Sequence, residues 1–93
     1  MGKETKLLKS EEQKTRPEVS AFLHQLADKV GEGRASLSQG REKIVLEIPQ
    51  NLILELQVED EIKGTKGIQH SLKVEIKWFD QEDQDAAGTL QLK

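Results

Sequence analysis

The sequence of 93 residues has no cysteine and no tyrosine, and its aromatic residues are two phenylalanines and one tryptophan. The absence of cysteine excludes disulfides, thiolate metal sites and catalysis by a cysteine nucleophile. No apolar run approaches the roughly 20 residues of a membrane-spanning helix, and residues 1–6 lead into no apolar signal-peptide segment. We therefore expect a cytoplasmic protein that does not insert into a membrane.

The composition predicts one modest core beneath a well-solvated surface. Charged residues make up 33% of the chain and hydrophobic residues 34%. A chain of this length forms one domain, which buries about 60–70% of the surface that is exposed in the unfolded state. The 14 basic and 17 acidic residues give a net charge of −3. The chain thus lacks the overall basic character of proteins that bind nucleic-acid backbones.

The clearest predicted element is a helix that begins after Thr15. Thr15 and Glu18 match the capping box, in which each side chain accepts a hydrogen bond from the other residue's backbone N–H. Pro17 fits the first turn, where a missing N–H costs nothing, and Gly31 and Gly33 are stop signals. One apolar stripe follows from Val19, Phe22, Leu23, Leu26, Ala27 and Val30.

After the helix the apolar period changes from 3.6 to 2, which is typical of antiparallel strands with one buried and one solvated face. The alternating positions are Ala35 and Leu37; Ile44, Leu46 and Ile48; Leu52, Leu54, Leu56 and Val58; and Ile68, Leu72, Val74, Ile76 and Trp78. Residues 6–11 are predicted to form a further short strand before the helix, although the two leucines there are adjacent rather than alternating.

Three turn sequences join the later strands into a predicted four-stranded meander. Gly40 and Arg41 suit a two-residue turn that pairs Leu37 with Ile44. Residues 49–51 (Pro-Gln-Asn) and residues 65–67 (Thr-Lys-Gly) suit three-residue loops. Each turn keeps the apolar positions on the same face of the sheet.

The last hairpin allows two registers that differ in how charges oppose each other. The three-residue loop sets Glu55 opposite Lys77 and Glu59 opposite Lys73. A register shifted by two residues sets Glu55 opposite Glu75, and like charges directly opposed are unfavourable. The sequence therefore favours the first register.

The predicted fold is α+β, with one helix packed on a four- to five-stranded, mainly antiparallel sheet in the order β-α-β-β-β-β. Residues 1–5 are predicted to be a flexible N-terminus, residues 6–79 the domain and residues 80–93 a disordered tail. The last segment is acidic, Gln-rich and nearly free of apolar residues, which does not support a packed core. The position of the first strand in the sheet is left open.

Four segments of the chain resemble the amphi-Trp domain, a family of small prokaryotic domains. They are residues 21–27 of the helix, Glu32 with Gly33, the strand end at residues 46–49 and, above all, residues 72–78 (Leu-Lys-Val-Glu-Ile-Lys-Trp). The resemblance covers residues 6–78 and agrees with the predicted fold. It implies a bacterial or archaeal source and brings no biochemical activity to this chain.

Trp78 and Phe79 are the candidate interaction residues. Trp78 either closes one end of the core or, with Phe79, anchors a protein partner. His70, opposite Ile62 on the inner side of the last strand, is interpreted as a partly buried residue at the edge of the core, and His24 as a surface residue. We find no spacing of metal ligands, no nucleophile with its base and no cofactor motif, so no metal, cofactor or catalytic residue is predicted.

These observations predict a non-enzymatic protein-interaction or oligomerisation module. It would bind an unknown protein or a second copy through a sheet edge or the outer sheet face. The alternative is a small-ligand binder or enzyme with a cleft near His70 and Trp78. A weaker third hypothesis is nucleic-acid binding through basic residues before the helix. These are Lys3, Lys6, Lys9, Lys14 and Arg16.

Overall fold

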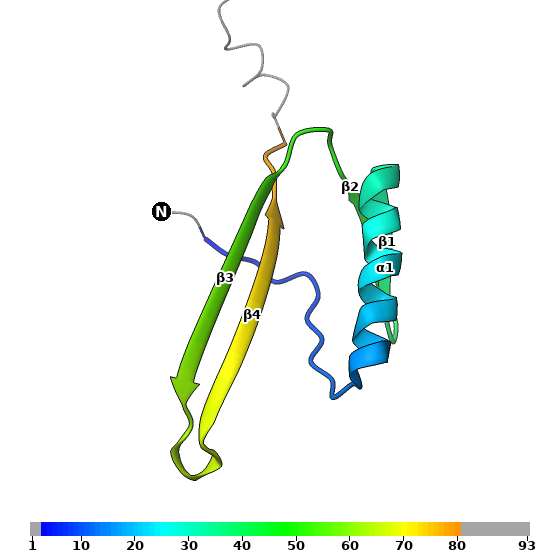
Figure 1. Ribbon diagram of the computed structural model, residues 1–93. Coiled ribbons are helices and arrows are strands. Elements are labelled where there is room, and N and C mark those ends of the chain that lie inside the picture. Colours follow the sequence, from blue (N-terminus) through cyan, green and yellow to red (C-terminus); the bar gives the residue numbers. More distant parts are fainter. Residues whose placement is uncertain (1–2, 81–93) are drawn as a thin grey trace, which may run out of the picture. The chain divides into compact units, whose positions relative to one another are not determined.

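The computed structural model describes residues 3–80, which contain one α-helix and four β-strands (Figure 1). The chain divides into two compact units, Met1–Ile48 and Pro49–Lys93. The first unit contains α1 (Arg16–Glu32), β1 (Arg34–Gln39) and β2 (Glu42–Glu47). The second contains β3 (Ile53–Ile62), the short 3₁₀-helix η1 (Gly64–Lys66) and β4 (Ile68–Lys77). The α+β class predicted from the sequence is confirmed.

The helix α1 begins and ends at the residues that its sequence signals. The backbone N–H of Glu18 donates to Thr15 Oγ1 at 3.3 Å, and the backbone N–H of Thr15 donates to Glu18 Oε1 at 2.9 Å. This confirms the predicted capping box. Gly31 lies inside the helix, and Gly33 ends it with a left-handed φ of 86°. The N–H of Gly33 donates to the carbonyl oxygens of Lys29 and Val30, so the last turn is capped.

The strands β1 and β2 form an antiparallel hairpin in the predicted register. Leu37 lies opposite Ile44, and Ala35 lies opposite Leu46. The two-residue turn has a positive φ of 59° at Gly40, which a glycine adopts without steric cost. Both the turn and the residues that share a face of this hairpin were thus predictable from local sequence.

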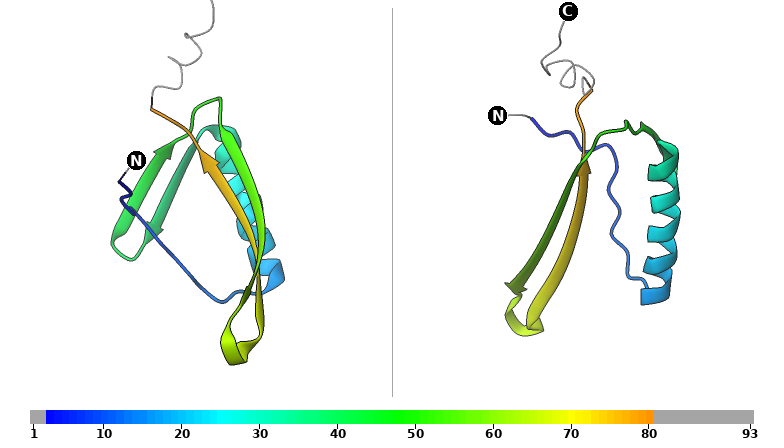
Figure 2. Two further views of the ribbon diagram at one scale, coloured as in Figure 1. Left: turned by 90° about the vertical axis from the view of Figure 1, so that its left-hand side faces the viewer. Right: turned by 45° about the horizontal axis from the view of Figure 1, so that its top comes forward.

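The core of the first unit lies between α1 and β1, which run beside each other (Figure 2). Ala35 of β1 is 3% exposed, and it is the most deeply buried of the described apolar residues. Phe22 and Leu26 of α1 and Ala35 and Leu37 of β1 line one depression between the two elements. The side of α1 that carries Phe22 and Leu26 therefore faces β1, although Phe22 stays 52% exposed.

The strands β3 and β4 form a second antiparallel hairpin, but in the register that the sequence analysis rejected. Ile62 pairs with Ile68, and Glu55 lies directly opposite Glu75. The connection has five residues rather than three, because η1 widens the loop and both Gly64 and Gly67 adopt positive φ angles. The prediction that Lys77 stands directly opposite Glu55 is wrong by two residues.

Two further expectations differ from the structure. Residues 6–11 form no strand; their two leucines offer no alternating face, and Leu7 is 60% exposed. The described residues form two separate two-stranded sheets, β1–β2 and β3–β4, with an irregular segment at residues 48–52. The element order is therefore α-β-β-β-β within residues 3–80. The predicted tail at residues 80–93 lies almost entirely outside the described residues.

Candidate interaction surface

One side of the β3–β4 hairpin is almost entirely aliphatic. In a β-strand alternate residues share a face, and the observed register brings together the even-numbered residues of both strands. We call this surface the apolar hairpin face. Its residues are Leu54, Leu56, Val58, Asp60, Ile62, Ile68, His70, Leu72, Val74 and Ile76.

The apolar hairpin face is comparable in size to the largest exposed apolar patch of a typical monomer. Seven of its aliphatic residues, all except Ile76, are 58–79% exposed. At roughly 100 Å² of apolar area for each side chain, they present on the order of 500 Å². The largest apolar patch on a typical monomer is about 300–600 Å² and often marks a binding site. An isolated two-stranded hairpin is also marginally stable in water, so burial of this face would stabilise the hairpin.

A single polar pair interrupts the apolar hairpin face. Asp60 and His70 lie directly opposite each other on β3 and β4, and Asp60 Oδ1 is 2.6 Å from His70 Nδ1. Their side chains are 64% and 74% exposed. The prediction that His70 lies opposite Ile62 and is partly buried is therefore wrong, because the register shift moves it beside Asp60.

The opposite side of the hairpin is charged, and its two lysines form ion pairs with glutamates of the facing strand. Lys77 Nζ lies 2.8 Å from Glu55 Oε1, and Lys73 Nζ lies 2.8 Å from Glu59 Oε1. The hydrogen bond from Lys77 lowers the pKa of Glu55 and raises that of Lys77. The hydrogen bond with Glu59 likewise raises the pKa of Lys73. The two lysines of this side therefore have ion-pair partners within the hairpin, whereas most aliphatic side chains of the apolar hairpin face are exposed.

The two aromatic candidates follow the end of β4, which stops at Lys77. Trp78 is half-buried, and Phe79 is 64% exposed. Neither lies within the strand, so the alternation along β4 does not continue to them. Of the two candidate interaction residues, Phe79 is the more exposed and Trp78 is partly covered.

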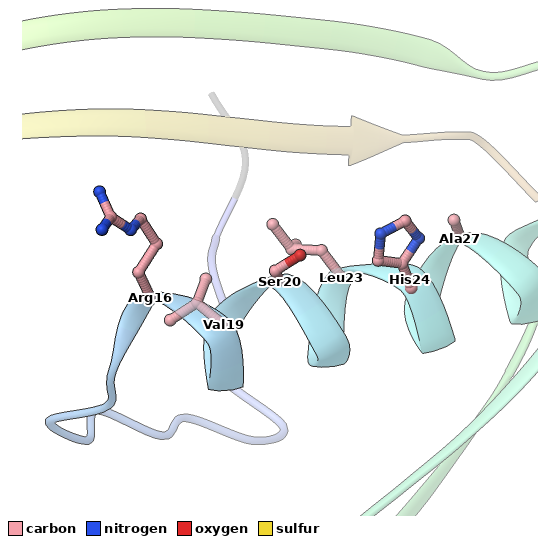
Figure 3. A pocket seen from close by; sticks show the side chains of 6 residues that line it. All are labelled: Arg16, Val19, Ser20, Leu23, His24 and Ala27. Carbon is pink, nitrogen blue, oxygen red and sulfur yellow. The ribbon is translucent and has the colours of Figure 1, made fainter.

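The helix carries a second, shallower depression of about 490 Å³. Its lining residues follow one side of α1 (Figure 3): Arg16, Val19, Ser20, Leu23, His24 and Ala27. Val19 and Leu23 are 44% and 53% exposed. His24 is exposed, as expected, and it stands beside Leu23 rather than apart from the apolar stripe. Neither this depression nor the one at β1 includes His70 or Trp78.

Within residues 3–80, no three histidine, aspartate or glutamate side chains come close enough together to hold a metal ion. No helix of the described part of the chain combines the length and the apolar character needed to cross a bilayer.

Comparison with known proteins decides the family. The family model of the Amphi-Trp domain matches residues 1–93, which is the whole chain and more than the 6–78 segment that carries the sequence resemblance. The chain belongs to the Amphi-Trp domain family. No curated protein and no solved structure matches it.

In this Amphi-Trp domain, the residues that gave the strongest resemblance form part of the apolar hairpin face. Leu72, Val74 and Ile76 alternate along β4 and line that face, and Trp78 follows directly after the strand. The sequence analysis identified this amphipathic strand but did not identify Asp60. The signal was present, because Asp60 shares the even-numbered positions of the aliphatic residues of β3.

Proposed function

We propose that this Amphi-Trp domain is a non-enzymatic protein-interaction or oligomerisation module whose binding surface is the apolar hairpin face. The observation that carries the proposal is the exposure of 58–79% of seven aliphatic side chains on one side of β3–β4. Burying apolar surface is the main favourable term in protein association, at about 25 cal/mol per Å². The charged side of the hairpin supports the same choice of surface, since its lysines already bind Glu55 and Glu59.

We further propose that the two hairpins join into one four-stranded antiparallel sheet, as the alternating sequence pattern and the turn at residues 49–51 predict. An α-helix is about 10 Å across, and strands lie about 4.8 Å apart, so one helix covers about two strands. Since α1 packs on β1, a four-stranded sheet also leaves much of the apolar hairpin face for a partner. A disulfide between cysteines introduced at Leu46 and Leu54 tests this sheet, and failure to form it under mild oxidation contradicts it.

A small-ligand site near His70 and Trp78 is the alternative function. It has one observation in its favour, which is the short contact between His70 and Asp60. A carboxylate that orients an imidazole is a common part of catalytic sites. The exposure of both side chains argues against a water-excluding cleft at this position. His70→Ala separates the two functions, because a ligand site loses its ligand, whereas a protein-binding face keeps most of its apolar area.

The proposed function is tested by mapping contacts on the labelled protein. Two-dimensional amide NMR spectra are recorded with increasing unlabelled protein and with fractions of a prokaryotic cell extract. Shifts are expected at the residues of the apolar hairpin face, and Leu56→Glu should abolish them. Gln57→Glu is the matched control, because it adds the same charge one residue away on the opposite side of β3. Shifts that survive Leu56→Glu, or that Gln57→Glu abolishes equally, contradict the proposal.

A further inference from the structure

The position of the Asp60–His70 pair constrains what can cover the apolar hairpin face. Both residues lie on the same face as the aliphatic side chains. The contact between Asp60 Oδ1 and His70 Nδ1 leaves Asp60 Oδ2 and His70 Nε2 for other partners. A purely apolar cover would bury those two atoms without hydrogen bonds, and buried charged or polar groups without partners are strongly unfavourable. The occupant must therefore supply a donor to Asp60 Oδ2 and a polar partner for His70 Nε2, which donates in the imidazolium form and accepts in the neutral ring that donates from Nδ1.

We propose that the occupant is a second copy of the same chain, related by a two-fold axis that runs along the strands between two apolar hairpin faces. This inference rests on the proposed function and names its partner. Such an axis places β3 of one copy over β4 of the other. Asp60 of each copy then lies over His70 of the partner subunit, and a His70 in the imidazolium form, in which both ring nitrogens donate, can donate from Nε2 to the remaining oxygen of that Asp60. An axis perpendicular to the strands through this pair instead sets Asp60 against Asp60, which like charges disfavour.

The size and composition of the face agree with this pairing. A standard interface buries about 800 Å² on each partner, and about 56–65% of that area is apolar. The apolar hairpin face, on the order of 500 Å² of apolar area, matches the apolar part of such an interface. With this axis the aliphatic row of β3 also meets the aliphatic row of β4 in the other copy, because both strands place aliphatic residues at the same levels.

The test uses two oppositely charged variants of the full chain, Asp60→His and His70→Asp. Sedimentation equilibrium at pH 6.0 is expected to show a wild-type dimer. Each variant alone sets like charges against each other across the axis and is expected to weaken the dimer at least tenfold. An equimolar mixture restores opposite charges at both positions, so its Kd should return to within about threefold of wild type. Amide spectra of each variant check that the hairpin remains folded.

Lys73→Glu is the matched control, because it creates a like-charge contact with Glu59 on the charged side of the same hairpin. It is expected to leave the Kd of the dimer unchanged. The inference is overturned if the variants dimerise as the wild type does, if the mixture gains no affinity, or if the wild type is a monomer at millimolar concentration. If the wild type is a monomer but the apolar hairpin face binds another protein, the inference fails and the proposed function stands. If the chain itself covers that face, both fail.

Discussion

Lys77 Nζ lies 2.8 Å from Oε1 of Glu55, although the residue directly opposite Glu55 on β4 is Glu75. Lys77 also lies 4.0 Å from Glu75 Oε1, so one ammonium stands between two carboxylates. The contact with Glu55 is diagonal across the hairpin, which is within reach of a long side chain. It offsets part of the repulsion between the two facing glutamates, and the cluster of one lysine and two glutamates stays net negative.

The diagonal ion pair predicts how Glu55 titrates. The hydrogen bond from Lys77 lowers the pKa of Glu55 below 4.5, so Lys77→Met should raise it toward that value. Because the folded-state pKa is the lower one, the pair stabilises the fold above pH 4.5 and loses its contribution as the pH falls through the folded-state pKa. Carboxyl ¹³C NMR measures the change. Lys73→Met is the control, since Lys73 binds Glu59; a Glu55 that titrates above 4.5 in the wild type contradicts the pairing.

The register of the second hairpin is tested with paired cysteines. The N–H of Lys63 donates to the carbonyl of Gly67 at 2.7 Å, and hydrogen-bonded pairs alternate along an antiparallel ladder. Leu56 and Val74 are therefore a non-hydrogen-bonded pair, with Cα atoms about 4.5 Å apart, which a disulfide can span. Leu56→Cys with Val74→Cys should oxidise rapidly. Leu56→Cys with Ile76→Cys, which are paired in the register that the sequence favoured, should oxidise slowly, and the reverse order of rates would disprove the observed register.

The end of α1 depends on the left-handed backbone of Gly33. A Cβ at this position would meet the carbonyl oxygen of Ile48 at 3.4 Å, and a φ of 86° is unfavourable for other residues. Gly33→Ala should therefore lower the free energy of unfolding by about 1–2 kcal/mol. Gly31→Ala is the matched change inside the helix, where nothing lies within 4 Å of the added Cβ; it should raise stability by about 0.5–1 kcal/mol. Urea denaturation distinguishes these results, and equal effects would contradict the cap assignment.

The start of α1 gives a comparable prediction. Thr15→Ala removes the oxygen that accepts the N–H of Glu18 and should cost about 1 kcal/mol in the free energy of unfolding. Thr15→Ser keeps that oxygen and should cost clearly less. The same denaturation experiment measures both variants. If the two variants lose the same stability, the capping bond contributes little.

Local sequence was sufficient for α1 and the β1–β2 hairpin. The capping box at Thr15, the stop at Gly33 and the pairing of Leu37 with Ile44 all depend on residues close together in sequence. Each has a specific backbone requirement that only a few residue types meet. The prediction of a strand at residues 6–11 failed because a strand needs a pairing partner, and nothing local supplies one for Leu7 and Leu8.

The second hairpin shows why its candidate site could be predicted only in part. Both registers bring Lys77 within reach of Glu55, either directly opposite or diagonally, so charge matching could not choose between them. The choice depended on a five-residue loop in which Gly64 and Gly67 both adopt positive φ. Alternation along β3 and β4 identified the apolar face, whereas the partner of His70 required the correct register.

The most direct test of the proposed binding surface asks whether the methyl groups of the apolar hairpin face are exposed to solvent in the monomer. Methyl NMR spectra of Leu54, Leu56 and Val58 are recorded with a soluble nitroxide that broadens solvent-exposed methyl signals. The account predicts broadening in dilute protein and in the His70→Asp variant, and protection when the wild type is concentrated. Equal protection of these methyl groups at every concentration, in a protein that remains monomeric, would show that the chain covers this face itself and would contradict the proposed binding surface.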